Sequence, residues 1–288
     1  MKPVISVITP VFNGEQFIQS CIQVVLDQHC PAVEHLIIDG GSNDRTLPII
    51  QQYAAQYPHI RWISQPDRGQ SDAMNKGIAL AQGDIIALLN VDDYYEPNVL
   101  NQVLQQFQTL SEPALLVGNC QIWNEHGQRI GLNRPEHLKL TDLLLGQNIH
   151  PFPLNPSAYF YHRSLHQTIG LYDVNDHYSM DVDFLFRAVQ AAHVRYVDQV
   201  WGNYRLMPGT KTFTDCHQGL NATRLEQLMN KYRRQLPWGV RSRFEVKYFF
   251  VKTGERIQYF AQHQDEIWPK LRARVQQWIS KMAISNDL

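Results

Sequence analysis

The chain has 288 residues, of which 44% are apolar and 18% are charged, and its formal net charge is -1. This apolar fraction supplies a sizeable core and excludes an intrinsically disordered chain. The four cysteines lack the CxxC spacing that indicates a zinc site or a disulfide framework, which fits a reducing compartment. We see neither a signal peptide nor an apolar run of roughly 18 residues, the length that spans a bilayer, and we therefore expect a cytoplasmic protein.

The charge is unevenly distributed along the chain. Segment 231–281 carries 12 of the 26 Lys and Arg but 4 of the 27 Asp and Glu, a net of +8, which leaves -9 for the remainder. The segment is also rich in aromatic residues. Two interpretations stay open: it contacts an anionic surface at the inner face of a membrane, or it is a helical appendage packed on the rest of the chain. No nucleic-acid-binding motif accompanies the charge, so we expect no nucleic-acid partner.

The first third of the chain alternates strand patterns with helical patterns. Strand patterns occupy 4–11, 33–39, 60–64 and 84–89, and helical periodicity occupies 17–28, 46–57 and 69–81. Strands that alternate with helices at this spacing predict an α/β fold with a mainly parallel central sheet flanked by helices.

The pattern is less regular after residue 97. Helices are expected at 98–109, 138–145 and 181–192, and short strands at 115–118, 121–123, 157–161, 194–197 and 202–205. Beyond residue 212 the pattern is largely helical. We therefore predict a domain at 1–212, with halves at 1–97 and 98–212, followed by a helical C-terminal extension at 213–288.

The stretch 84–93 reads DIIALLNVDD, an apolar run that ends in two adjacent carboxylates. The run predicts a buried strand, and Asn90, Asp92 and Asp93 place oxygen atoms where that strand leaves the sheet. Ligands bind at this edge of open α/β sheets, and hard oxygen ligands suit Mg²⁺ or Mn²⁺. The alternative is a strand followed by a solvated Asp-Asp turn.

A second candidate site begins at Asp39, which ends the second strand pattern and is followed by GGSND. Glycines at a strand end let the backbone approach a ligand closely, and an Asp there can accept a hydrogen bond from a base or a ribose. A plain turn is the alternative. The GxGxxG motif of dinucleotide enzymes is absent, which argues against a dehydrogenase.

Several motifs in a fixed order together carry a family resemblance. They are PVFNG at 10–14, IIDGGSNDRT at 37–46, PDRGQSDAMNKGIALAQGD at 66–84, LNVDD at 89–93 and SMDVDFLFR at 179–187. Together they resemble a family 2 glycosyltransferase with the GT-A type fold. The resemblance covers roughly residues 5–211 and makes 1–97 the nucleotide-binding half and 98–212 the acceptor half.

The resemblance implies a role for each matching residue. The nucleotide pocket would be lined by Pro10, Phe12 and Asn13, with Asp39 holding the base, typically uracil. The nucleotide and donor sugar would lie beside Asp67, Gly69, Gln70 and Asp72. Around the diphosphate, Asp92 would hold Mn²⁺ or Mg²⁺ as the last acid of the Asp-x-Asp motif, accompanied by Asn90, Asp93, Arg205 and Lys211. Asp181 matches the catalytic base, although a helix cap is its alternative reading, and the following Asp183 would point elsewhere.

The implied activity is inverting transfer of a sugar from a nucleotide-sugar donor, expected to be a UDP-sugar, to a hydroxyl of a glycan or lipid-linked acceptor. Such enzymes assemble polysaccharide, lipopolysaccharide or glycolipid of the cell envelope. The reaction needs a cation to neutralise the leaving diphosphate and a carboxylate to take the acceptor's proton. One departure matters: Asn90 stands where the family often has an Asp, which predicts weaker metal binding. The alternative function is therefore a non-catalytic nucleotide-sugar-binding partner of another transferase.

Overall fold

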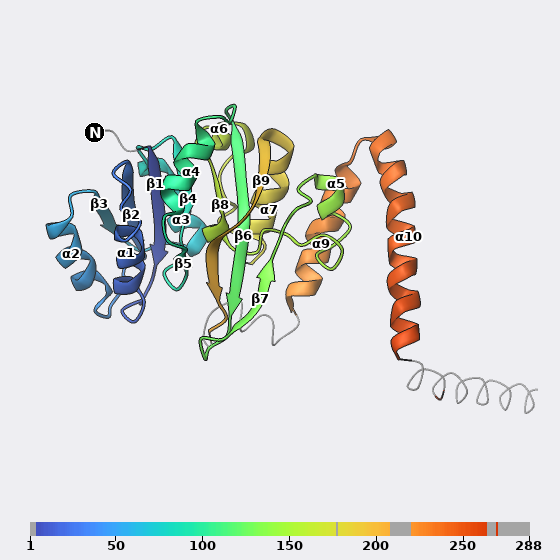
Figure 1. The fold of residues 1–288 in the computed structure, drawn as a ribbon, viewed down its shortest axis with the longest axis horizontal. Helices are drawn as coiled ribbons and strands as arrows, with labels where there is room; N and C mark the ends of the chain where they lie inside the picture. The colour runs from blue at the N-terminus through green and yellow to red at the C-terminus, as the bar shows by residue number, and fades with distance from the viewer. Residues whose placement is uncertain (1–3, 177, 208–219, 264–268, 270–288) are drawn as a thin grey trace, which may run out of the picture. The chain divides into compact units, whose positions relative to one another are not determined.

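A computed structural model describes residues 4–176, 178–207, 220–263 and 269 (Figure 1). The chain divides into two compact units, Met1–Tyr232 and Arg233–Leu288. The division falls within helix α9 (Leu220–Gln235). The predicted domain boundary after residue 212 lies outside the described residues and stays a prediction.

The first unit is built on one sheet of nine strands, counted over the described residues (Figure 1). The strands are β1 (Ile5–Val11), β2 (Val33–Asp39), β3 (Ile60–Ser64), β4 (Ile85–Leu88), β5 (Tyr94–Tyr95), β6 (Ala114–Trp123), β7 (Arg129–Asn133), β8 (Tyr159–His162) and β9 (His193–Arg205). Their order is β3-β2-β1-β4-β8-β6-β9-β5, and β7 pairs with β6. All residues of β1, β2 and β4 are buried, as their apolar, β-branched runs predict.

The sheet is parallel over its first four strands and mixed beyond them. β1 pairs in parallel with both β2 and β4, and β2 pairs in parallel with β3. β8 runs antiparallel between β4 and β6, and β9 returns parallel to β6. Since β2 and β3 lie on one side of β1 and β4 lies on the other, the strand order reverses beside β1. The carboxyl edge at such a reversal is where open α/β sheets bind ligands.

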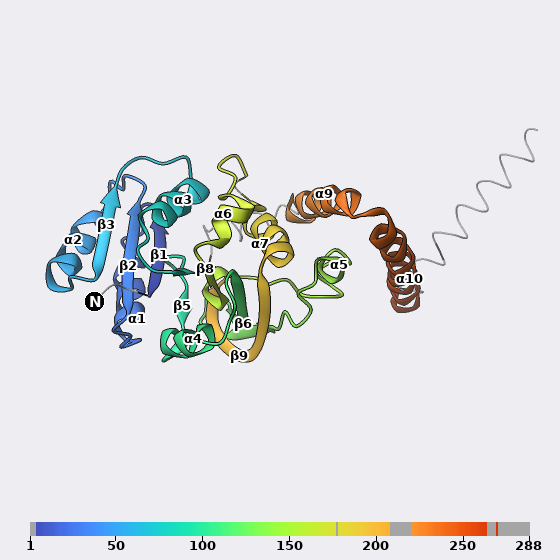
Figure 2. The ribbon, with the colours of Figure 1, turned by 90° about the horizontal axis from the view of Figure 1, so that it is seen from above.

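Helices cover both faces of this sheet (Figure 2). Apolar side chains of α3 (Gln70–Leu80), α6 (Leu165–Ile169) and α7 (Met180–Ala191) pack on one face. Those of α1 (Ile18–Leu26), α2 (Thr46–Gln56) and α4 (Val99–Phe107) pack on the other. The remaining short elements are α5 (Leu140–Leu143) and the 3-10 helix η1 (Pro156–Ala158). The arrangement confirms the predicted α/β fold.

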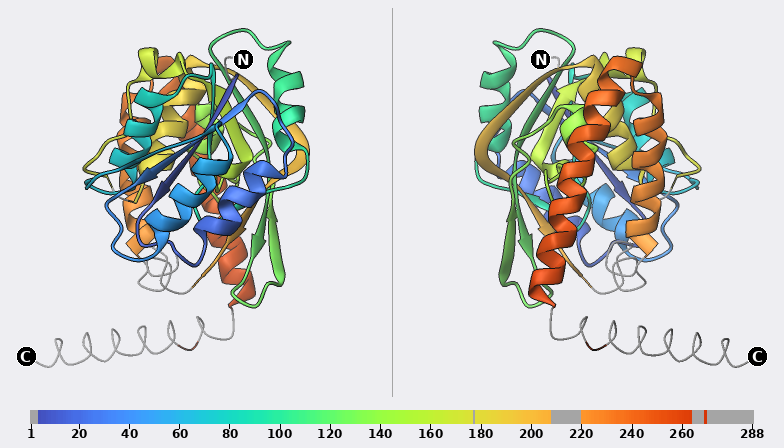
Figure 3. Two further views of the ribbon diagram at one scale, coloured as in Figure 1. Left: turned by 90° about the vertical axis from the view of Figure 1, so that its left-hand side faces the viewer. Right: turned by 90° about the vertical axis from the view of Figure 1, so that its right-hand side faces the viewer.

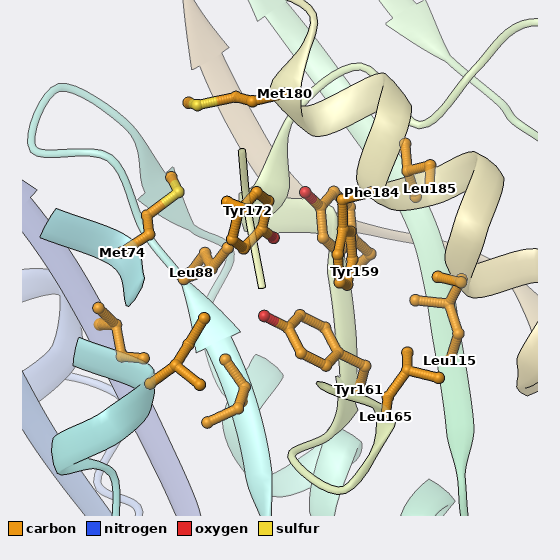
Figure 4. Packing of buried hydrophobic residues seen from close by; sticks show 14 of the residues in the cluster. Met74, Leu88, Leu115, Tyr159, Tyr161, Leu165, Tyr172, Met180, Phe184 and Leu185 are labelled. Carbon is orange, nitrogen blue, oxygen red and sulfur yellow. The ribbon is translucent and has the colours of Figure 1, made fainter. Parts of the chain in front are cut away.

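An aromatic cluster holds α7 on the sheet (Figure 4). The rings of Tyr159, Tyr161 and Tyr172 surround Phe184 of α7, with centroid distances of 4.8 to 6.2 Å. All four side chains are buried. This packing determines where the first turn of α7 lies, because Phe184 is one turn from Met180 at the start of the helix.

Two pairs of predicted short strands are each one long strand in the structure. Segments 115–118 and 121–123 both belong to β6, and segments 194–197 and 202–205 both belong to β9. The β6–β9 register shifts between Val117 and Asn119 and again before Cys120, and β9 is strongly bent (Figure 3). A register shift of this kind breaks the alternation of apolar residues, so the sequence pattern appears interrupted although the strand continues.

The second unit contains α10 (Trp238–Gln262), which follows Pro237. Within the described ranges, no helix combines the length and the apolar character needed to cross a membrane.

Helix α3 approaches β1 so closely that only glycine fits at position 77. A Cβ there would lie 2.3 Å from Cγ2 of Ile8 and 3.3 Å from Cγ1 of Ile38. We expect Gly77→Ala to lower the free energy of unfolding by about 1–3 kcal/mol, since overpacking outweighs the gain in helix propensity. Denaturant unfolding followed by circular dichroism measures this loss.

Gly254→Ala is the matched control, because the space around that helical glycine is empty to 4 Å. Alanine in a helix interior is favoured over glycine by roughly 0.5–1 kcal/mol, so this variant should be as stable as the parent or more stable. A Gly77→Ala protein with the stability of the parent would contradict the close packing of α3 on β1.

Candidate functional site

The carboxyl ends of β1, β2 and β4 bring three of the sequence motifs to one edge of the sheet. Val11 and Asp39 are register partners at the ends of β1 and β2, and the backbone N–H of Gly40 donates to the carbonyl of Val11 at 2.9 Å. β4 ends beside β1, where Leu88 pairs with Ile8. The loops after these strands are therefore neighbours.

The loop after β1 is hydrogen-bonded to the loop after β2. The backbone N–H of Asn13 donates to Oγ of Ser42 at 2.8 Å, and Oδ1 of Asn13 accepts from the N–H of Asn43 at 3.0 Å. Asn13 has a positive φ of 50°, which asparagine tolerates better than most residues. Asn13 and Phe12 are exposed at this edge, whereas Pro10 is buried in β1.

Asp39 is fully buried and binds its own loops. Its carboxylate accepts hydrogen bonds from the hydroxyl of Ser64 at 2.6 Å, from the backbone N–H of Ser42 at 3.1 Å and from the hydroxyl of Ser42. Both carboxylate oxygens are engaged in this way. Asp39 thus holds the Gly40–Ser42 turn in place, and its contact with a base stays a prediction.

Asp67 lies directly against the turn that Asp39 holds. A Cβ at Gly40 would come within 2.6 Å of Oδ2 of Asp67, so glycine is needed there to admit the carboxylate. The other oxygen of Asp67 accepts from the N–H of Gly69 at 2.8 Å. The loop before α3 is thereby joined to the loop after β2.

Gly69 and Asp72 shape the start of α3. Gly69 has a φ of 111° and precedes the first helical residue. Oδ2 of Asp72 accepts from the backbone N–H of Arg68 at 3.1 Å and lies 3.4 Å from Nζ of Lys76. The Arg68 N–H and the Lys76 charge hold the pKa of Asp72 below its usual value. Asp72 therefore remains ionised in the first turn of α3 and holds the backbone of Arg68, which precedes the helix.

A chain of side-chain hydrogen bonds runs from α3 through the loop after β4. Nε2 of Gln70 donates to Oδ1 of Asn90 at 2.8 Å, and Nδ2 of Asn90 donates to Oδ2 of Asp93 at 2.8 Å. Nδ2 of Asn155 donates to the same oxygen of Asp93 at 2.7 Å. The side-chain amide of Asn90 thus accepts from Gln70 through its oxygen and donates to Asp93 through its nitrogen, an arrangement that no carboxylate could make without an added proton.

Asp92 and Asp93 differ in their surroundings. Burial and the neighbouring Asp92 carboxylate raise the pKa of Asp93 to about 8. Burial also raises the pKa of Asp92, although the guanidinium of Arg205 opposes the rise. Arg205 lies at the end of β9, with its guanidinium carbon 4.8 Å from the centre of the Tyr94 ring.

The described residues contain no group of three or more His, Cys, Asp or Glu side chains placed to hold a metal ion. Asp92 is partly exposed, whereas Asp93 is buried and Asn90 is occupied by its neighbours. One available carboxylate fits a divalent cation that takes its remaining ligands from substrate phosphates and water. Lys211, predicted to contact the diphosphate, lies outside the described residues.

The start of α7, which carries Asp181, contacts the first turn of α3. Ser71, next to Gln70, has its hydroxyl oxygen 2.6 Å from Sδ of Met180 and 3.1 Å from the carbonyl oxygen of Asp176. Asp181 follows Met180 in the first turn of α7. The first turn of α3 therefore contacts both the Asn90 loop and the helix start that carries Asp181.

Asp183 is engaged in a contact between α7 and α9. Its carboxylate accepts from Nε of Arg187 at 2.8 Å and from the hydroxyl of Tyr232 at 2.9 Å, and Nζ of Lys231 lies 3.6 Å away. The Tyr232 ring also meets Phe186 edge-on at 5.1 Å. Asp183 thus has a structural role that is distinct from any role of Asp181.

The partners that organise this edge were not found from the sequence. Ser64 supports Asp39, Asn155 supports Asp93, and Ser71 joins α3 to α7. The prolines around Asn155 predicted only a loop. Ser71 lies inside a recognised motif, which is the one signal that could have singled it out.

Comparison with known proteins places this geometry in a family. Residues 6–170 match the sequence model of glycosyl transferase family 2. A PGL/p-HBAD biosynthesis glycosyltransferase of Mycobacterium bovis is 32% identical over 211 residues, which cover 72% of this chain and 78% of that protein. The chondroitin synthase of Pasteurella multocida is 27% identical over 214 residues, 73% of this chain but only 21% of the synthase.

Two solved structures share the fold at low sequence identity. S. aureus TarS 1-349, determined with UDP-GlcNAc, has a TM-score of 0.59 and 17% identity over 73% of this chain and 60% of its own. The mannosyltransferase PcManGT of Pyrobaculum calidifontis, determined with GDP-Man and Mn²⁺, has a TM-score of 0.59 and 15% identity over 99% of this chain and 81% of its own. With a family match over more than half of its length and the predicted GT-A fold, the chain belongs to glycosyl transferase family 2.

Proposed function

We propose that this chain is an inverting, metal-dependent glycosyltransferase that moves a sugar from a nucleotide-sugar donor to an acceptor hydroxyl. The observation that carries the proposal is the first turn of α3. Gln70 contacts Asn90 in the loop that carries Asp92, and Ser71 contacts Met180 beside Asp181. The loop that carries Asp92 and the helix start that carries Asp181, 89 positions apart in the sequence, thus both contact the first turn of α3.

The donor that we propose is a UDP-sugar. TarS, which shares the fold, was determined with UDP-GlcNAc, and the loops after β1 and β2 have the same place at the carboxyl edge that nucleotides use in open α/β sheets. Phe12 and Asn13 are exposed there for contact with the nucleotide. Asp39 contributes by holding the Gly40–Ser42 turn against Asp67.

Asp92 would hold Mn²⁺ or Mg²⁺ together with the donor diphosphate. Such a cation neutralises the charge that develops on the leaving diphosphate. Arg205 lies close enough to oppose the rise that burial causes in the pKa of Asp92, and it would add a second positive charge beside the diphosphate. Asn90 and Gln70 position the loop that presents Asp92, rather than acting as ligands themselves.

Asp181 would act as the general base. Its carboxylate takes the proton of the acceptor hydroxyl while the acceptor oxygen forms a bond to the anomeric carbon. The bond between that carbon and the diphosphate breaks, and its electron pair leaves with the diphosphate. Attack from the side opposite the leaving group inverts the anomeric configuration.

The acceptor that we propose is a glycan or a lipid-linked glycan of polysaccharide or glycolipid assembly. The similar proteins named as a chondroitin synthase and as a PGL/p-HBAD biosynthesis glycosyltransferase support this class. The non-catalytic alternative was motivated by the amide at Asn90. Its bonds to Gln70 and Asp93 supply another reason for that amide, and we do not propose the alternative.

Asp93 serves as a buried support for the Asp92 loop. Oδ2 of Asp93 accepts from two amides, while Oδ1 is buried and has no hydrogen-bond partner among the described residues. A carboxyl group with a pKa near 8 holds a proton at neutral pH, which avoids a second negative charge beside Asp92. Because this protonated form is the one that the fold favours, the stability of the fold depends on pH.

The assignment of Asp181 predicts a large loss of turnover in Asp181→Asn. Removal of a general base lowers kcat by about 10²- to 10⁴-fold, while the Kd for UDP should stay unchanged because the nucleotide lies with other loops. Transfer from UDP-sugars in the presence of Mn²⁺ measures kcat, and calorimetry measures UDP binding. Asp27→Asn, at the opposite end of α1 from the Asn13 loop, is the control and should retain full activity. Undiminished kcat in Asp181→Asn would refute the base assignment.

A shared cation site predicts that metal and nucleotide bind cooperatively. Mn²⁺ should tighten UDP binding, and removal of the metal with EDTA should reverse the effect. Asp92→Asn should abolish the dependence of the UDP Kd on Mn²⁺ and leave the metal-free Kd nearly unchanged. UDP affinity in the parent that is indifferent to Mn²⁺ and EDTA would remove Asp92 from the metal site.

Asp93 predicts a specific pH dependence of stability. Its pKa is about 8 in the folded chain against an ordinary value of 3.8, so the folded state binds more protons between these two pH values. The contribution of Asp93 to the free energy of unfolding therefore falls as pH rises from about 4 to 8. Asp93→Asn removes this slope, and the parent should lose stability relative to the variant across that interval. Parallel unfolding curves of the two proteins at every pH would contradict the proposal.

A further inference from the structure

Helix α10 presents a row of exposed apolar side chains, which we call the apolar face of α10. Its members are Trp238, Val246, Phe249, Phe250 and Ile257, whose residues are 59% to 86% exposed. They recur at intervals of three, four, seven and eight residues, which places them on one side of a helix. Such a row is unusual on a water-facing helix, because each side chain forgoes the free energy of burial.

Basic side chains border this face. Arg243 and Lys247 lie at one edge, and Arg241 and Lys252 lie at the other. The two acidic residues of the helix are paired, Glu245 with Arg241 and Glu255 with Lys252, each at 2.7 Å. Over 233–262 the sequence carries seven Lys and Arg against these two acids, a net of +5.

We propose that the apolar face of α10 lies in the interface of an anionic lipid membrane. An apolar face rich in aromatic residues, bordered by Lys and Arg, is the pattern of helices that lie flat at a membrane surface. The basic edges would reach the headgroups, and the aromatic rings would enter the boundary with the acyl chains. The proposal goes beyond the transferase activity and does not rest on it.

Charge favours a membrane over a second copy of the chain as the occupant. Two such helices packed face to face would bring basic edges close to one another, with their acids already paired within each helix. An anionic bilayer supplies both the apolar surface and the opposite charge. For an enzyme whose acceptor is carried on a lipid, such attachment would also hold the chain at the surface where its acceptor lies.

Co-sedimentation of the full chain with vesicles tests the proposal. The expected result is pelleting with phosphatidylcholine vesicles that contain phosphatidylglycerol, little pelleting with phosphatidylcholine alone, and release at high salt. The double variant Phe249→Ser/Phe250→Ser should lose about tenfold or more in the partition coefficient, since each ring gives up its apolar burial. Reversal of one edge by Arg243→Glu/Lys247→Glu should cost about fivefold or more for each residue changed.

Val240→Ser is the matched control. Val240 is an exposed apolar residue of the same helix but lies off the apolar face, two residues from Trp238, and its variant should bind as the parent does. The absence of pelleting with anionic vesicles would overturn the proposal, as would equal binding to neutral vesicles. A dimer that dissociates in the Phe249→Ser/Phe250→Ser variant, without vesicle binding by the parent, would assign the face to a second copy instead. Turnover on a soluble acceptor is measured separately, so the vesicle-binding result can be interpreted even if the chain has no transferase activity.

Discussion

The candidate site depends on the burial of one carboxyl group, that of Asp93. Burial of an ionisable group costs several kcal/mol unless hydrogen bonds or a proton compensate. Asn90 and Asn155 both donate to Asp93, and they come from separate parts of the chain. Asn155 lies directly before η1, in the second half of the first unit. Asn90 also accepts a hydrogen bond from Gln70 of α3. Satisfying one buried group therefore fixes the loop after β4 against both halves of the first unit.

The need to hydrogen-bond the buried carboxyl group of Asp93 also explains why Asn90 stands where the family often has an Asp. An amide at position 90 can donate to Asp93 and accept from Gln70 at the same time, which an ionised carboxylate cannot do. The loss of a negative charge at this position is matched by a gain in hydrogen bonding that orders the loop. Asp92, next to Arg205, is then the carboxylate of this loop that remains partly exposed.

Local pattern predicted the first half of the fold well, because β1 to β4 are buried parallel strands and α1 to α3 have clear periodicity. The lengths of β6 and β9 were predicted wrongly, because register shifts interrupt the alternation of apolar and polar residues by which a strand is recognised in a sequence. The partners of site residues were also missed: Asp93 and Asn155 are 62 positions apart, and Asp183 and Tyr232 are 49 apart. Periodicity describes a residue's neighbours along the chain, and it contains no information about which distant side chain will satisfy a buried group. Motif order located Asp92 and Asp181, whose roles remain predictions, but it did not reveal that Asp39 is fully enclosed by Ser42 and Ser64.

The contact between Gly40 and Asp67 bears on how this site can change. The two residues share one volume, since the position of a Cβ on Gly40 is taken by the Asp67 carboxylate. Substitutions at residues in contact are generally not additive, so a side chain at position 40 becomes acceptable only if position 67 shrinks or moves first. The order in which mutations arise then matters, and a library that varies position 67 alone samples only the variants compatible with glycine at 40. Redesign of this edge of the sheet would need to vary both positions together.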